Sequence, residues 1–137
     1  MSLSDNESLV TRYLHAWYSQ DFEVMRRCLA DDVRFDMGIG PSFDDADDLV
    51  EFCRAAPTFR DLTLLELLTQ DDRVALVFDG IRADTGTRSR SALFVRVEEG
   101  KICSIVVSAS PLDVELDDSP STWRSRDPVT LSHGTLL

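Results

Sequence analysis

Few side chains in this sequence combine the types and the spacing that acid-base chemistry needs. Asp36 stands in a stretch of alternating apolar residues, and His15 stands in the first amphipathic segment. A carboxylate and an imidazole of near-neutral pKa, held in a dry pocket, could abstract a proton beside a carbonyl group or eliminate water. His15 is two residues from both Tyr13 and Trp17, about 200° around a helix from either. If those two face the pocket, we expect His15 on the surface.

Other arrangements that carry chemistry are missing from the sequence. Cys28, Cys53 and Cys103 are odd in number and widely spaced, which fits neither a disulfide framework nor metal-ligand spacing, so we interpret them as core thiols. The acidic run DDADD at residues 44–48 lacks the glycine and the distal glutamate of a calcium loop, and it suits the first turn of a helix. There is no glycine-rich phosphate loop and no Ser-His-Asp arrangement. We therefore expect neither a metal ion nor another cofactor.

Size and charge restrict the partners. The 137 residues correspond to one domain, and the hydrophobic fraction of 43% is enough for a core. The formal net charge of −11 disfavours binding to nucleic acid or to an anionic membrane. Residues 1–10 contain no basic segment followed by an apolar one, and no apolar run approaches the roughly 18 residues of a spanning helix. We expect a cytoplasmic protein.

Helical periodicity fills the first part of the chain. Apolar residues at helical spacing predict three helices, at residues 8–20, 22–30 and 44–56. Asp21 is the expected N-cap of the second helix, and Ser42 with Asp45 resembles a capping box for the third. Between these helices, alternation predicts a short strand that begins at residue 32 and runs into a turn at Gly38–Pro41.

Strand periodicity fills the second part. Four strands are predicted, at residues 61–70, 73–84, 87–97 and 101–110. Short turns between successive strands favour an antiparallel meander, and helices followed by strands favour an α+β domain with helices on one face of a curved sheet. We assign this domain to residues 1–110. Residues 111–137 show no clear period and are expected to be an irregular tail that wraps the body or a partner chain.

The predicted strands carry apolar residues on both faces. In strand 73–84 one face has Val74, Leu76 and Phe78, and the other has Ala75, Val77 and Ile81. An antiparallel sheet with one face in water would alternate apolar with polar residues. Residues 59–110 hold eight acidic and seven basic side chains, so this part is nearly neutral. We predict that the same sheet of a second copy covers the outer face, which makes a homodimer about a two-fold axis.

The order of these elements resembles SnoaL-like proteins of the nuclear transport factor 2-like superfamily. Trp17, Asp21 and the string ADDV at residues 30–33 carry the match. Two later strings, DDRVALVF and LFVRVEEGKI, resemble the third strand and the fourth-to-fifth hairpin of that superfamily. The resemblance covers roughly residues 8–109. It implies a cone in which three helices and a strongly bent, mainly antiparallel sheet enclose an apolar pocket.

Relatives in that superfamily include ketosteroid isomerases, polyketide cyclases and dehydratases. By this resemblance, Tyr13 falls where isomerase-like relatives place a tyrosine that donates a hydrogen bond to a developing oxyanion. Their general-base aspartate falls at Met37, so Asp36 is one residue early and would turn inward only through a bulge or local twist. Their protonated acid corresponds to Leu93 or Ala92, neither of which can donate a proton. We therefore do not expect steroid isomerase activity.

For the charged residues near the strand ends we predict ion pairs and no part in catalysis. Asp79 faces away from the implied pocket, and we expect it to pair with an arginine at the dimer interface. Arg82, Arg88, Arg90 and Asp84 are expected to form a network of weak ion pairs at the rim.

Two functions fit these residues. One is a cofactor-free isomerase, cyclase or dehydratase that acts by proton transfer on an apolar carbonyl compound, with Tyr13 polarising the carbonyl and Asp36 moving the proton. The other is a module of the same fold that binds an apolar ligand, or only assembles as a dimer, without catalysis. The predicted pocket residues are Trp17, Phe35, Met37, Phe78 and Leu93. The orientation of Asp36 separates the two hypotheses.

Overall fold

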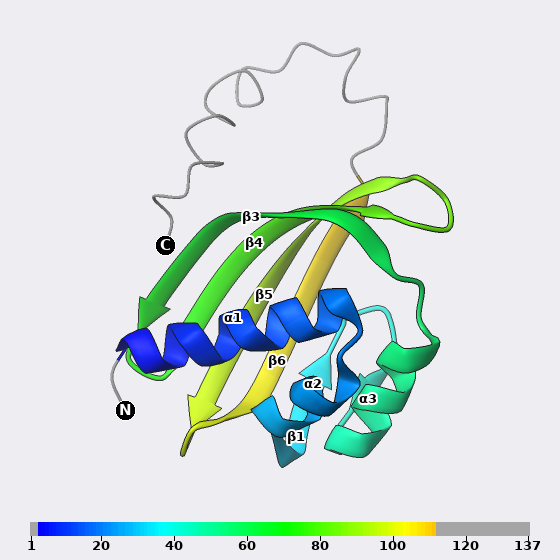
Figure 1. Cartoon of the computed structure of the whole chain (residues 1–137). Coiled ribbons are helices and arrows are strands. Elements are labelled where there is room, and N and C mark those ends of the chain that lie inside the picture. Colours follow the sequence, from blue (N-terminus) through cyan, green and yellow to red (C-terminus); the bar gives the residue numbers. More distant parts are fainter. Residues whose placement is uncertain (1–2, 112–137) are drawn as a thin grey trace.

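The computed structural model describes residues 3–111, which form three helices and one six-stranded sheet (Figure 1). The helices are α1 (Leu3–Ser19), α2 (Phe22–Cys28) and α3 (Ala46–Ala55). The strands are β1 (Leu29–Asp36), β2 (Ser42–Phe43), β3 (Phe59–Gln70), β4 (Arg73–Arg82), β5 (Arg88–Glu98) and β6 (Lys101–Pro111). The predicted α+β class, with three helices on a curved and mainly antiparallel sheet, is confirmed. Within residues 3–111, no helix is long and apolar enough to cross a membrane.

The sheet has the strand order β2-β1-β6-β5-β4-β3. Strands β3 to β6 form the predicted antiparallel meander. Strand β1 joins β6 in parallel, and β2 returns antiparallel to β1. The sequence did not indicate this parallel pair, because side-chain alternation identifies a strand but not its partner.

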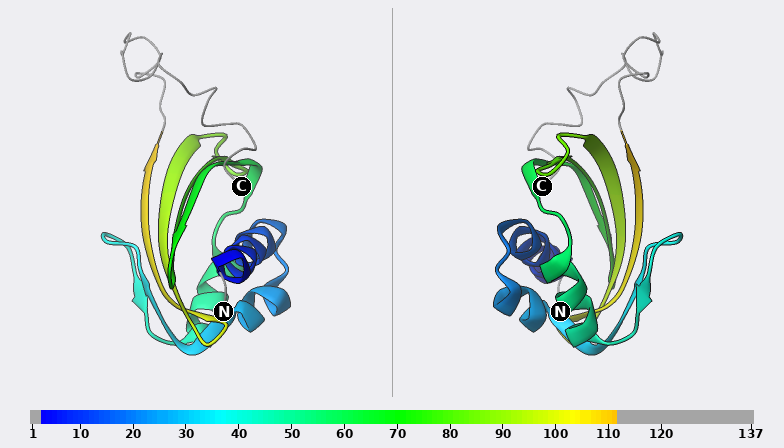
Figure 2. Two further views of the ribbon diagram at one scale, coloured as in Figure 1. Left: turned by 90° about the vertical axis from the view of Figure 1, so that its left-hand side faces the viewer. Right: turned by 90° about the vertical axis from the view of Figure 1, so that its right-hand side faces the viewer.

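The sheet is strongly curved, and the three helices lie against its concave face (Figure 2). Register shifts occur at two places between β3 and β4, and at one place between β5 and β6. Such bulges bend a strand and increase its twist. The β1–β2 hairpin bends away from the body (Figure 2).

The caps at two helix starts differ in how well the sequence predicted them. Asp21 caps α2 as expected, because its carboxylate accepts a hydrogen bond from the Val24 N–H at 3.2 Å. The predicted capping box of α3 is wrong. Ser42 belongs to β2, and Asp45 is the N-cap, accepting from the Asp48 N–H at 3.0 Å.

Alternation along the strands divides the sheet into two faces. In β4, Val74, Leu76 and Phe78 are buried on the concave face beneath the helices. Ala75 and Val77 lie between them on the convex face and are only partly buried. The core is therefore one layer thick, between the helices and the concave face. The predicted tail 111–137 lies outside the described residues, apart from Pro111 at the end of β6.

Candidate active or ligand-binding site

A cavity of about 480 Å³ lies between the concave face of the sheet and helices α1 and α3. This volume is in the range of small-molecule sites in proteins, roughly 300–1,000 Å³. Tyr13, Leu14 and Trp17 of α1 form one wall together with Phe52 and Cys53 of α3. Strands β1, β4 and β5 supply Phe35, Phe78 and Leu93 to the facing wall. Most of the cavity wall is apolar, so it favours contact with apolar groups of a ligand.

The structure places all five residues that the sequence proposed for a pocket on the wall of this cavity. They are Trp17, Phe35, Met37, Phe78 and Leu93. Trp17 packs between two phenylalanines, with ring centroids 5.4 Å from Phe59 and 5.9 Å from Phe78. Such tilted aromatic contacts fix the position of the indole ring.

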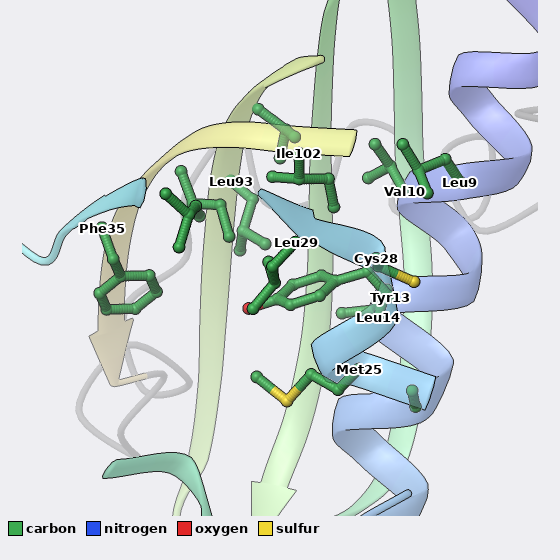
Figure 3. Close-up of a cluster of buried hydrophobic side chains, with 14 of the residues drawn as sticks. Leu9, Val10, Tyr13, Leu14, Met25, Cys28, Leu29, Phe35, Leu93 and Ile102 are labelled. Atoms are coloured by element: carbon green, nitrogen blue, oxygen red, sulfur yellow. The ribbon is translucent and has the colours of Figure 1, made fainter. Parts of the chain in front are cut away.

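Tyr13 lies one helical turn before Trp17 on α1 and lines the same cavity. Its side chain extends from α1 across a cluster of buried apolar residues, with the hydroxyl at the end remote from the helix (Figure 3). The residue is only 3% exposed. No hydrogen bond within the described part of the chain engages its hydroxyl. Tyr13 therefore presents a free donor to the cavity.

Burial controls the protonation of the groups that line this cavity. Loss of hydration raises the pKa of Tyr13 far above its ordinary value of 10.0, and the nearby Cys53 and Cys28 raise it further. Burial likewise raises the pKa of the Cys53 thiol to about 11. At neutral pH both groups keep their protons, so Tyr13 is a hydrogen-bond donor and not a base.

Asp36, whose orientation the sequence left open, does not reach the cavity. Regular alternation at the end of β1 buries Val33 and Phe35 and leaves Asp36 exposed. Its carboxylate accepts a hydrogen bond from the Gly38 N–H at 2.7 Å. The bulge that would have turned Asp36 inward is missing, because the strand stays in register with β6 from Arg34 to Asp36.

Two further expectations concern groups outside the cavity. His15 is exposed on α1, as the helical spacing predicted. Asp79 lies on the convex face of the sheet, where it accepts two hydrogen bonds from Arg90 at 2.7 and 2.9 Å. Among the described residues that line the cavity, the titratable side chains are Tyr13, Cys53 and Arg82. The lining therefore supplies a hydrogen-bond donor but neither a carboxylate nor an imidazole.

The family of SnoaL-like domains matches residues 10–105, which is most of the chain. This protein belongs to the SnoaL-like domain family. A comparison of the SnoaL-like chain with curated protein sequences finds no match.

Solved structures with the same fold come from several bacteria. A putative ketosteroid isomerase from Kribbella flavida DSM 17836 superposes with a TM-score of 0.75 at 18% identity, over 96% of each chain. A putative polyketide cyclase from Xanthomonas campestris pv. campestris has a TM-score of 0.63 and 22% identity, over 77% of this chain and 90% of its own. An LEH-like epoxide hydrolase from M. tuberculosis has a TM-score of 0.69 and 13% identity, over 79% of this chain and 84% of its own. At these identities the likeness shows the fold alone.

The sequence reasoning missed the polar part of this SnoaL-like cavity. Arg82 was expected only in a rim ion pair with Asp84; that pair forms, but Arg82 also lines the cavity. Ser89 and Ser91 line it as well. The sequence does place these serines with the pocket residue Leu93, because residues 89, 91 and 93 lie on the same face of β5. Serines between arginines nevertheless resemble an ordinary solvated strand end.

The raised pKa of Tyr13 predicts how the stability of this SnoaL-like domain depends on pH. In the unfolded chain tyrosine ionises near pH 10, whereas in the folded protein Tyr13 holds its proton to higher pH. The stabilisation is therefore complete below about pH 10 and is lost as the pH rises further, by up to about 1.4 kcal/mol per pH unit. Urea unfolding between about pH 9 and 11 should show this loss for the native chain and a shallower one for Tyr13→Phe.

Tyr18→Phe is the matched control, because it removes the second tyrosine of the chain and leaves Tyr13 in place. It should keep the steep loss of stability. Equal slopes for the native chain and Tyr13→Phe would contradict the assignment of this dependence to the buried phenol.

Proposed function

We propose that this SnoaL-like protein binds an apolar small molecule that carries a neutral hydrogen-bond acceptor, such as a carbonyl group. The observation that carries the proposal is the neutral Tyr13 hydroxyl, free of partners within the described residues, on the wall of an apolar cavity. The aromatic rings of Trp17 and Phe78 would contact the apolar body of the ligand. Tyr13 would orient it through the acceptor.

The energetics favour a ligand of this class. Burial of apolar ligand surface contributes roughly 25 cal/mol per Å² before the cost of association. A hydrogen bond from Tyr13 is strengthened by the apolar surroundings, and it satisfies a donor that would otherwise stay unpaired. A ligand with no acceptor would bury the hydroxyl without compensation. The Tyr13 hydroxyl therefore acts mainly on specificity: it disfavours ligands that lack an acceptor more than it raises the affinity of ligands that carry one.

Proton-transfer catalysis by an isomerase, cyclase or dehydratase is the alternative that the family suggests. It needs a group that accepts a proton beside the carbonyl at neutral pH. Asp36 is exposed, and Tyr13 and Cys53 keep their protons. We therefore favour binding and polarisation of the carbonyl over proton abstraction by the residues that line the cavity.

Titration calorimetry with two matched ligands tests this function. An acetylnaphthalene offers a carbonyl group, and its isopropenyl isostere replaces that oxygen with carbon at nearly constant shape. The native protein should bind the ketone more tightly, by about fivefold for one hydrogen bond. Tyr13→Phe should remove this preference and leave the affinity for the isostere nearly unchanged. Incubation of the ketone in deuterated buffer should give no exchange of its acetyl protons above background.

Two results would contradict the proposal in different ways. The absence of binding of both naphthalenes would exclude an aromatic ligand of this size. Protein-dependent exchange that Asp36→Asn abolishes would restore the proton-transfer hypothesis. Cys103→Ser, a change outside the cavity lining, is the control for nonspecific effects of substitution.

The convex face of the sheet supports the predicted homodimer, which we also propose. One cross-strand row on this face is apolar and consists of Leu68, Ala75, Phe94 and Val106. Leu68 is 64% exposed and Phe94 is 55% exposed in the single chain. The Asp79–Arg90 ion pair lies on the same face, so a two-fold axis would bring apolar rows together between charges of both signs.

Sedimentation velocity at micromolar concentration tests the dimer. The native protein should sediment at about twice the mass of one 15.4 kDa chain. Phe94→Asp should give the single chain, because it places a charge in the apolar row. Ile39→Asp, at a hydrophobic residue in the turn after β1 that is more exposed than Phe94, should stay dimeric. A native species of 15.4 kDa would contradict the proposal.

A further inference from the structure

The polar lining of the cavity is concentrated toward the hairpin that joins β4 and β5. Ser89 and Ser91 line the cavity from β5, and Thr85 and Thr87 come from the hairpin itself. This hairpin stands at one end of the curved sheet, beyond the C-terminal end of α1 (Figure 1). Tyr13 and Leu93 belong to the apolar part. The cavity is therefore amphipathic along its length.

The two serine hydroxyls have no partners within the described part of the chain. The Oγ atom of Ser89 is buried and makes no hydrogen bond there. Ser91 is only 6% exposed, and no hydrogen bond among residues 5–110 engages its hydroxyl. A buried hydroxyl without a partner costs roughly 1–3 kcal/mol. Successive side chains on one face of a strand are about 7 Å apart, so an elongated ligand that contacts the Ser91 hydroxyl also extends along Ser89. Rotation about the Cα–Cβ bond of Ser89 would bring its buried hydroxyl to that ligand.

The surroundings explain why the protein itself leaves Ser89 unsatisfied. Its partner in β4 is Gly80, which has no side chain to offer. A Cβ atom at Gly80 would lie 2.7 Å from Cδ2 of Phe59, so the ring of Phe59 covers this position closely. An aromatic hydrocarbon cannot satisfy a hydroxyl group. Glycine at this position keeps the space beside Ser89 free of other polar side chains.

Charge at this end indicates a neutral ligand group. Arg82 is the one charged side chain among the described lining residues, and Asp84 holds its guanidinium through contacts of 3.1 and 2.8 Å. That pairing compensates the positive charge, so a ligand carboxylate would gain little there and would lose its hydration. A hydroxyl or a second carbonyl group suits the two serines better.

We propose that Ser89 and Ser91 form a second polar subsite, which recognises a neutral hydroxyl or carbonyl group at the far end of the ligand that Tyr13 holds. The ligand class is thereby narrowed to elongated, neutral molecules with an apolar middle and a polar group at each end. This inference rests on the proposed binding function, because Tyr13 supplies the first contact.

A third naphthalene tests the subsite by calorimetry. It carries the acetyl group and, on the opposite ring, a hydroxymethyl group. The native protein should bind it about fivefold more tightly than the plain acetylnaphthalene, since one hydrogen bond is added. In the double variant Ser89→Ala with Ser91→Ala this gain should disappear, while the affinity for plain acetylnaphthalene stays the same. Ser8→Ala, at an exposed position of α1 outside the cavity lining and away from the convex face, should keep the gain.

The outcomes separate the two proposals. If plain acetylnaphthalene binds in a Tyr13-dependent manner but the hydroxymethyl group adds nothing, the second subsite is overturned and the proposed function stands. The same holds if the serine double variant retains the full gain. If neither ketone binds, both proposals fail. A purely structural role for the serines would change the midpoint of urea unfolding in the double variant without altering the affinity ratio, and this too would overturn the subsite.

Discussion

Side-chain alternation on a sheet that is covered on one face is the constraint on which this protein depends. Along β1, β4 and β5 it directs Phe35, Phe78 and Leu93 toward the helices. By the same rule it directs Asp36 and Asp79 to the opposite face. A shift of one residue in register would exchange these two sets of residues. The register of each strand therefore determines which of its side chains line the cavity.

Curvature turns this alternation into a site. The helices fill most of the concave face with core side chains such as Val10 and Leu49, but a volume of about 480 Å³ remains under the bend. Inside it, burial keeps the Tyr13 hydroxyl protonated, and the buried Oγ atom of Ser89 has no partner among the described residues. These two hydroxyls can recognise neutral acceptors and donors, while the carboxylate that would be needed for proton transfer lies on the other side of the same sheet.

Periodicity predicted the elements well but not their relations. The meander, the Asp21 cap and the exposed position of His15 follow from local spacing, and the structure confirms each. The parallel β1–β6 pair and the short strand β2 depend on contacts between distant residues, so no local pattern revealed them. For the same reason the serines of β5 could be placed on a face but not in a cavity. Asp36 would have faced the cavity only if β1 carried a bulge at its end, and side-chain alternation in the sequence does not show whether a strand carries a bulge.

The carbonyl stretching frequency of acetylnaphthalene bound to the protein tests the central claim most directly. A hydrogen bond from Tyr13 in an apolar cavity weakens the C=O bond. Infrared difference spectra with carbonyl-labelled ligand should therefore show a lower frequency in the native protein than in Tyr13→Phe. Bound ligand with the same frequency in both proteins would contradict the claim that the buried, neutral Tyr13 hydroxyl holds the ligand.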